Sequence, residues 1–369
     1  MKFSCEKAIL SQAVGLASRT VSPKSALEVL EGICVRAGMS LQMTGYNLET
    51  GITVGVEAEV LEQGSCVMPA RLFSDIIRKL PDDMVTVEVD ESYRACITCG
   101  ISSFTISALP ADDYPELPDV DGEAAVRMSQ QDLKKLINGT IFAVSDNQSR
   151  PIHTGCLFEI EDETATVVAV DGYRLALRRA KLSEPSLAKL RFVVPGPALK
   201  ELEKMLSDTE EMVRFTPGKK HISFKIENAT LICRLLEGEF LDWRRVLPEN
   251  SPVQLTVNAS KLATVIERMS LVISEKVKTP VRCVFGDQKA DFHTASTVGT
   301  AHDVCEIAGD GQELEIGFNC KYLLDAIRAV PDDEVVLELT NSLSPIVLTP
   351  CNKDGSYSYM VLPVRLKAE

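Results

Sequence analysis

Apolar residues fall at helical spacing in six segments of the chain, so six helices are predicted. They span about residues 5–20, 70–80, 129–144, 196–207, 259–273 and 319–330. The second, fourth and sixth segments share one pattern, and each is followed by an acidic turn and a strand-like stretch. This pattern recurs roughly every 125 residues, which is the length of a domain rather than of a solenoid repeat. The chain is therefore predicted to contain three copies of one fold.

Most of the sequence between these helices alternates apolar and polar residues with the period of two that is typical of strands. Residues 54–60 and 85–89 are two examples. Asn258, and Ser129 with Asp132, stand where helix N-caps are expected. Each unit is predicted to be an α+β domain in which two amphipathic helices lie on antiparallel sheet.

Two short segments rich in proline and acidic residues, 116–123 and 247–252, separate the predicted units. Such composition is common in connections between domains. We therefore expect three domains, at residues 1–120, 126–247 and 254–369.

Composition favours a cytoplasmic protein. Eleven cysteines, an odd number, are scattered without framework spacing, as is typical of reduced thiols in a cytoplasm. The first seven residues lack the apolar core of a signal peptide. No uncharged apolar run approaches the ~18–20 residues that a membrane span needs, so no membrane partner is expected.

The charge of the chain is unevenly distributed. The formal net charge is −14, which by itself disfavours binding to nucleic acid. The six predicted helices nevertheless carry 13 Lys and Arg against seven Asp and Glu, so their net charge is +6 and that of the remainder is −20. Either helices merely tolerate lysine well, or they form one electropositive face on an acidic body.

Helix dimensions decide what such a face could enclose. Six helices side by side, ~9 Å apart, form a ring with a bore of only ~7 Å. Twelve helices give a bore near ~25 Å, which admits a DNA duplex with a layer of water. If the protein encircles DNA, it is therefore expected to be a head-to-tail dimer.

Catalytic and metal-binding signatures are mostly absent from the sequence, so no catalytic residue, cofactor or metal is expected. There is no phosphate-binding glycine loop, dinucleotide-binding motif or hydrolase motif. The pair Cys96 and Cys99 has no second pair, and residues three apart in a strand point to opposite faces. The four histidines show no ligand spacing.

Three other stretches carry functional signals: residues 167–176, 240–248 and 357–366. The first breaks at Asp171-Gly172, a strong hairpin signal. Its Gly-Tyr-x-Leu core has a counterpart at residues 44–48, which indicates scaffold, but Arg174 has no basic counterpart there. The second stretch contains the only tryptophan, and the third is apolar where most chain ends are polar.

Together with the threefold repeat, these stretches resemble the bacterial sliding clamp family, the β subunits of DNA polymerase III. The resemblance covers the whole chain and rests on residues 170–175, 242–248 and 361–365, supported by 69–71 and 109–115. It implies a ring formed by a head-to-tail homodimer that encircles duplex DNA without regard to sequence. It further implies a non-catalytic accessory subunit of a DNA polymerase holoenzyme, a nucleotidyltransferase complex.

In that family a pocket between the second and third domains receives short peptides from polymerases, the clamp loader and repair proteins. The resemblance implies that the pocket here is formed by Val170, Gly172, Tyr173, Arg174, Leu175, Leu241, Arg245, Val246, Asn319, Tyr322, Met360, Val361, Leu362, Pro363, Val364 and Arg365. Aliphatic walls suit a Leu or Phe anchor, and the three arginines could steer an acidic or amide-rich peptide. His153, Leu241 and Tyr173 depart from the residues common in the family, which implies a shifted peptide preference.

The resemblance also implies DNA-facing and dimer-forming positions. Lys24, Arg71 and Asn147 are expected to face DNA, and Phe104 is expected to meet Leu271 and Val272 of a second copy. Departures from the family at residues 151–152 and 196–197 imply weaker direct DNA contacts.

The hypothesis is therefore a processivity factor that catalyses nothing and keeps a polymerase near its template. The competing hypothesis is a three-domain enzyme or small-molecule-binding protein with an interdomain cleft, which predicts a monomer. A sequence-specific DNA-binding protein fits poorly, because no recognition helix is flanked by a basic patch.

Overall fold

The computed structural model describes residues 1–122, 124–186, 188–248, 250–273 and 279–366. They form two compact units: Met1–Gln130 with Glu201–Leu235, and Gln131–Lys200 with Leu236–Glu369. Glu123 and Glu249, which belong to the predicted domain joints, lie outside the described residues. The boundaries expected at residues 120, 126, 247 and 254 stay a prediction.

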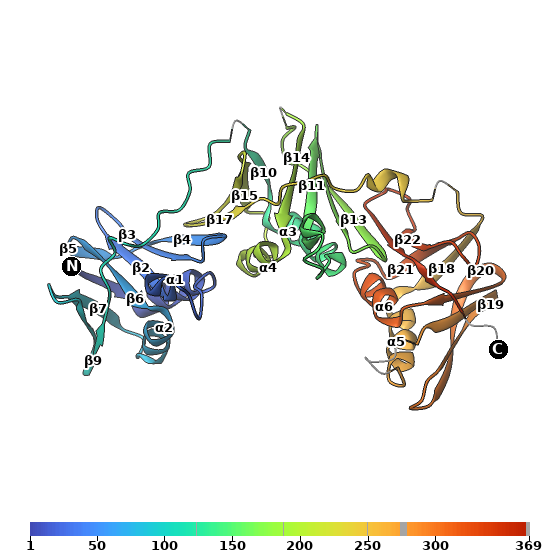
Figure 1. Cartoon of the computed structure of the whole chain (residues 1–369), viewed down its shortest axis with the longest axis horizontal. Helices are drawn as coiled ribbons and strands as arrows, with labels where there is room; N and C mark the ends of the chain where they lie inside the picture. Colours follow the sequence, from blue (N-terminus) through green and yellow to red (C-terminus); the bar gives the residue numbers. More distant parts are fainter. Residues whose placement is uncertain (123, 187, 249, 274–278, 367–369) are drawn as a thin grey trace. The chain divides into compact units, whose positions relative to one another are not determined.

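Within the described residues, six α-helices lie close to the predicted positions (Figure 1). They are α1 (Lys7–Ser18), α2 (Ala70–Lys79), α3 (Gln130–Asn138), α4 (Gly196–Met205), α5 (Ala259–Ser270) and α6 (Cys320–Arg328). The third helix ends earlier than expected: a separate 3₁₀ turn, Ile141–Ala143, follows α3. Gly139, a poor helix former, stands at the break.

The first unit contains two antiparallel sheets. One has five strands in the order β5 (Glu59–Glu62), β1 (Lys2–Glu6), β7 (Met84–Val89), β8 (Arg94–Cys99) and β9 (Ser102–Ser107). The other has eight, in the order β10 (Val126–Ser129), β15 (Met212–Pro217), β16 (His221–Ile226), β17 (Ala229–Arg234), β4 (Thr50–Val56), β3 (Leu41–Tyr46), β2 (Gly32–Ala37) and β6 (Gly64–Pro69). Helix α1 packs on β3 and β4, and α2 packs on α1.

Residues 54–60 form two strands instead of the single one that their alternation suggested. Val54 and Val56 are buried in β4, whereas Val60 lies in β5, which belongs to the other sheet. Glu57 and Ala58 make the crossing between the sheets. Alternation persists through the crossing because both strands keep one apolar face inward, and periodicity alone cannot show a change of partner.

The second unit contains one sheet of eleven strands. Its order is β14 (Leu190–Pro195), β11 (Gly155–Glu161), β12 (Thr164–Val170), β13 (Arg174–Lys181), β23 (Tyr357–Val361), β22 (Ile346–Pro350), β21 (Glu334–Leu339), β18 (Val253–Asn258), β20 (Thr300–Phe318) and β19 (Val281–Ala295), with β24 (Pro363–Val364) paired to β20. Helix α5 packs on β18, β19 and β20, and α6 packs on α5 and β23.

Each unit joins strands from two of the predicted domains by direct backbone pairing. In the first unit β17 pairs with β4, and in the second β23 pairs with β13. Both pairings are antiparallel. Strands far apart in the sequence therefore continue one sheet across each predicted domain boundary.

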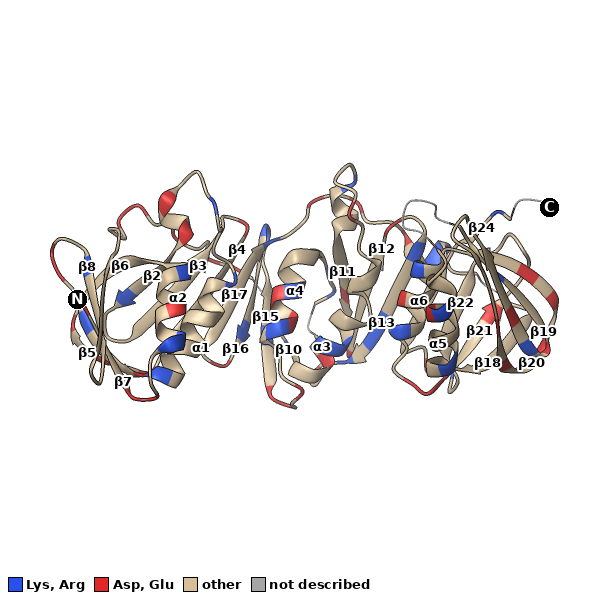
Figure 2. Cartoon of the chain, turned by 90° about the horizontal axis from the view of Figure 1, so that it is seen from below, with Lys and Arg blue, Asp and Glu red and all other residues tan. Residues whose placement is uncertain are grey.

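The observed helices keep the predicted excess of positive charge. Over their bounds they contain 12 Lys and Arg against six Asp and Glu, and Figure 2 shows basic residues on each of them. Among the described residues, every helix is too short or too polar to span a membrane.

A helix cap in the third repeat gives a direct test of the local assignments. The Asn258 side chain accepts a hydrogen bond from the Lys261 backbone N–H at 2.9 Å, at the start of α5. Asn258→Ala should lower the free energy of unfolding by about 1 kcal/mol, because that N–H loses its partner. Chemical denaturation measures the change, and Asn258→Ser should restore most of it; equal losses in both variants would contradict the cap.

Candidate functional site

A tight turn between β12 and β13 begins the site. The Asp171 carboxylate accepts the backbone N–H groups of Tyr173 at 2.9 Å and Arg174 at 3.1 Å. Gly172 has φ +92°, a conformation that suits glycine. The predicted hairpin is confirmed, and its turn leaves the Tyr173 side chain 62% exposed.

The Gly-Tyr-x-Leu stretch of the first repeat is not a structural counterpart of this turn. Gly45 and Tyr46 lie inside β3, with Tyr46 buried. A Cβ at Gly45 would lie 1.9 Å from the Ala17 carbonyl oxygen, so this glycine allows α1 to approach the strand. The expectation of a common scaffold role was wrong, because the Gly-Tyr pair lies in a strand in the first repeat and in a turn in the second.

Arg174 is held by two carboxylates. Its Nε lies 2.8 Å from Asp171 Oδ2 and its Nη1 lies 2.6 Å from Asp325 Oδ2. The guanidinium also stands over the Tyr322 ring, 4.5 Å from its centroid, and its side chain is only 8% exposed. The two carboxylates balance the charge of Arg174, so we infer that it holds the turn against α6, and the expectation that it steers a peptide stays a prediction.

An apolar cluster adjoins these residues on the β12–β13–β23 part of the sheet. Its buried members are Leu157, Val168, Val170, Leu175, Leu177, Val193, Phe240, Trp243, Val347 and Met360, and Ile152, Leu236, Val246, Leu247 and Leu362 pack against them half-buried. The cluster brings together five of the predicted pocket residues from three separate stretches: Val170, Leu175, Val246, Met360 and Leu362. Apolar surface of this kind, partly covered, suits an aliphatic or aromatic anchor.

The tryptophan stretch is fixed beside the cluster by Glu159. Trp243 Nε1 donates to Glu159 Oε2 at 3.2 Å, and Arg244, which stacks on the indole at 4.2 Å, lies 2.9 Å from the same oxygen. Arg245 points elsewhere: it pairs with Asp242 at 3.1 Å and is 86% exposed. Arg245 is thus the more exposed of the two arginines, since the Arg244 side chain is 57% exposed.

A cavity of about 890 Å³ opens next to Arg174, between the β12–β13 turn and α6. Tyr173 and Tyr322 stack in its wall with their ring centroids 6.0 Å apart. Burial, followed by the negative charge of Asp171, raises the pKa of Tyr322, so its phenol stays neutral at ordinary pH. Asn319 also lines the cavity and caps α6 by accepting the Tyr322 backbone N–H at 3.3 Å.

Three family models match successive parts of the chain. They are the N-terminal domain of the DNA polymerase III beta subunit over residues 1–118, its central domain over 127–242 and its C-terminal domain over 244–365. Beta sliding clamps of Staphylococcus epidermidis and Staphylococcus aureus are each 33% identical to the chain, over 99% of both sequences.

Solved structures agree with these matches. A putative DNA polymerase III beta subunit from Eubacterium rectale aligns with a TM-score of 0.94 at 32% identity, over 99% of this chain and all of the other. The DNA polymerase sliding clamp from Bacillus subtilis aligns with a TM-score of 0.94 at 31% identity, over the full length of both. The chain belongs to the DNA polymerase III beta subunit family, the sliding clamps. The predicted three-domain α+β clamp fold is confirmed.

The last residues that the family resemblance assigned to the pocket are divided between two strands. Met360 and Val361 are buried in β23, which pairs with β13, whereas Pro363 and Val364 form β24, which pairs with β20. Arg365 is exposed beyond β24. The clamp chain therefore turns at Leu362, and its last predicted residues leave the apolar cluster.

Two of the residues that the resemblance marked as departures lie at the cluster's margin. His153 packs edge-on against Phe240, with ring centroids 5.5 Å apart. Burial and then the charge of Arg150 lower the pKa of His153, which keeps the imidazole neutral at neutral pH. Leu241 is 41% exposed and adds apolar surface next to buried Phe240.

Of the remaining predicted residues, only Asn147 borders this site, and the expected DNA-facing and dimer-forming roles stay predictions. Lys24 and Arg71 are exposed in the first unit. Asn147 is exposed and lines the 890 Å³ cavity, where its side chain accepts the Ser149 N–H at 2.9 Å. Phe104 is 41% exposed on β9, and Leu271 is 79% exposed after α5, with Val272 half-buried beside it.

Sequence reasoning missed the residues that hold the site together. Asp325 Oδ2 lies 2.6 Å from Arg174 Nη1, and the Phe142 ring centroid lies 5.5 Å from the Arg174 guanidinium carbon. Both residues were predicted only as parts of helices, without a functional role. Asp325 is 151 residues from Arg174 in the chain. No local pattern links positions so far apart.

The two arginines give a matched test of the site's electrostatics. Arg174→Met should lower the free energy of unfolding by about 2–3 kcal/mol, because Asp171 and Asp325 lose a partner that is largely removed from water. Arg245→Met should leave stability almost unchanged, because its ion pair is exposed. Urea denaturation of both variants measures the difference, and equal effects would contradict the positioning role.

Proposed function

We propose that two copies of this chain close head to tail into a ring around duplex DNA and tether DNA polymerases to it. The observation that carries the proposal is the way each predicted domain boundary is built. At both boundaries a strand that follows the second helix of one repeat pairs with a hairpin strand of the preceding repeat: β17 with β4, and β23 with β13.

In the first and third repeats, among the described residues, the corresponding strands each keep one unpaired edge. β9 follows α2 as β17 follows α4 and β23 follows α6, yet β9 is the end strand of its sheet. The counterpart of β4 and β13 is the first part of β20, Thr300–Glu306, which pairs with β19 on one side. Among the described residues no strand pairs with its other side. A second copy supplies the missing partner for each edge, which joins the copies head to tail.

Exposed apolar residues support this arrangement of edges. Phe104 lies on β9, and Leu271 follows α5, which packs on β20. Covering such side chains on association is favourable. Both positions are those expected at the dimer interface.

A closed ring retains DNA by topology, so it needs few direct contacts. The net positive charge of the helices favours DNA weakly, whereas the acidic remainder opposes wrapping on the outside. Few phosphate contacts leave little salt-sensitive binding, which permits sliding. Lys24, Arg71 and Asn147 are the proposed contacts, and the protein acts in the cytoplasm as a non-catalytic subunit.

The apolar cluster and the neighbouring cavity form the proposed docking site for short peptides of polymerases, the clamp loader and repair proteins. The cluster accepts a Leu or Phe anchor, and the stacked pair Tyr173 and Tyr322 lies next to it. Arg245 and Arg365 are exposed and supply the positive charge that favours an acidic peptide. Arg174 is paired with Asp171 and Asp325, so its charge adds little to this attraction.

Retention on DNA tests the ring. The protein loaded on nicked circular DNA should survive a high-salt wash and should be lost after the DNA is linearised, because only topology holds it. Phe104→Asp should abolish retention. In light scattering it should convert a dimer of about 81 kDa, twice 40.4 kDa, into a monomer. Leu343→Asp, which also places a charge at an exposed apolar residue, should change neither result. Equal loss of the unaltered protein from circular and linear DNA would exclude encirclement.

Peptide binding tests the docking site separately. A fluorescent acidic peptide with a Leu-Phe anchor should bind the unaltered protein, and Leu241→Asp should weaken it by about tenfold or more, because a charge then borders the apolar wall. Met39→Asp, at an exposed methionine of the first unit, which does not contain the apolar cluster, is the control. Fluorescence anisotropy measures both, and undiminished binding to Leu241→Asp would displace the site.

A further inference from the structure

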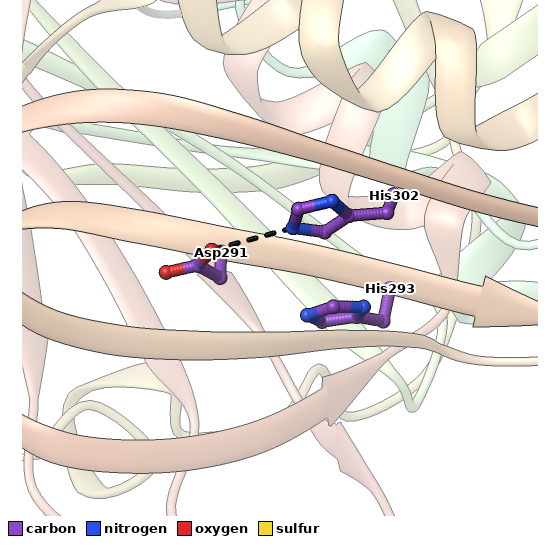
Figure 3. Close-up of side chains that lie close together, drawn as sticks. All are labelled: Asp291, His293 and His302. Carbon is purple, nitrogen blue, oxygen red and sulfur yellow. Dashed lines mark hydrogen bonds and ion pairs between the residues drawn. The ribbon is translucent and has the colours of Figure 1, made fainter.

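Three side chains that no sequence motif groups together meet on the β19–β20 ribbon (Figure 3). His293 on β19 pairs directly with His302 on β20, and Asp291 lies two residues before His293 on the same face of the strand. The two imidazole rings stack with centroids 4.3 Å apart, and His302 Nε2 lies 3.3 Å from Asp291 Oδ1. One nitrogen or oxygen from each residue lies within 4.8 Å of the others.

The cluster lies on the accessible face of the ribbon. The alternate residues of β19, Ala290, Phe292 and Thr294, are buried in the core. His302 is 53% and Asp291 23% exposed. An ion from solvent can therefore reach all three side chains, and the core residues between them fix the backbone that carries them.

The chemistry of the three groups suits a divalent transition metal. Imidazole nitrogen and carboxylate oxygen are ordinary ligands of Zn²⁺. Lys289 Nζ lies 3.2 Å from Asp291 Oδ2, which leaves Oδ1 directed toward His302.

The three side chains need only a small movement to coordinate one ion. Four ligands at about 2.0–2.1 Å around a tetrahedral ion lie about 3.3 Å from one another. The present spacing of up to 4.8 Å closes by rotation of exposed side chains, without movement of the strands. Water can complete the coordination on the open side.

The same place in the other two repeats carries different chemistry. Thr44 with Thr53, Val168 with Leu177, and His293 with His302 are each cross-strand pairs separated by eight intervening residues in their hairpins. Val168 and Leu177 belong to the apolar cluster of the proposed peptide site, and the two threonine hydroxyls hydrogen-bond to each other at 3.1 Å. The fold thus places no demand for histidine here, so the ligands of the third repeat are not part of the common scaffold.

We propose that Asp291, His293 and His302 bind one divalent transition-metal ion of the Zn²⁺ type per chain. The ion ties β19 to β20 by coordinating one imidazole from each strand. This proposal does not depend on ring formation or on peptide binding.

Metal titration of the full chain tests the site. After treatment with a chelator and its removal, calorimetry with Zn²⁺ should show one site per chain. Loss of an outer-shell partner already costs about 10–100-fold in metal affinity, so His293→Ala and His302→Ala should each weaken binding at least tenfold. The control His221→Ala, at a histidine of β16 outside the cluster, should bind Zn²⁺ as the unaltered chain does. If His302→Ala does not fold, His302→Gln replaces it in the titration.

One spectroscopic and one thermal measurement distinguish metal binding at this site from metal binding by the cysteines, of which Cys351 is exposed. Co²⁺ bound by nitrogen and oxygen should show visible d–d bands without a thiolate charge-transfer band. Zn²⁺ should raise the Tm of the unaltered protein, because it binds the folded state, and should not raise that of His302→Ala. Absence of binding, undiminished binding to both histidine variants, or a thiolate band would each overturn the proposal.

Discussion

Backbone pairing between the edge strands of successive repeats is the constraint on which the rest of this molecule depends. An unpaired strand edge presents a row of N–H and C=O groups that can hydrogen-bond to another strand. Here the repeats use that property: β17 completes β4, and β23 completes β13. Every repeat contributes two strand edges: one on the strand that follows its second helix, and one on its hairpin. Joining three repeats in a row uses two edges of each kind and leaves one of each, which in this chain are β9 and the start of β20.

The junction between β13 and β23 also creates the candidate functional site. The pairing places Leu175 opposite Met360, so apolar residues from two distant stretches share one cluster. Arg174 then fastens the adjoining turn to α6 through Asp325. The site is therefore a consequence of how repeats are joined, and not of a motif that any single stretch contains.

Repetition of the fold has not imposed repetition of chemistry. One cross-strand position holds a hydrogen-bonded pair of threonines, a buried pair of aliphatic residues or a stacked pair of histidines. The backbone pairing is the same in all three hairpins, because it is made by main-chain groups that are independent of side-chain identity. Side chains at this position are consequently free to serve a different purpose in each repeat.

The sequence by itself determined the six helices, the α+β class, the threefold repeat and the stretches that carry the family resemblance, because hydrophobic periodicity and turn residues act over a few neighbouring positions. Only the tertiary structure decided which strands are partners. Residues 54–60 belong to two different sheets, and Gly45 lies in a strand whereas Gly172 lies in a turn. Arg174 pairs with Asp325, and His293, His302 and Asp291 lie close together. Register and long-range pairing depend on residues far apart in the chain, and local patterns contain no information about that choice.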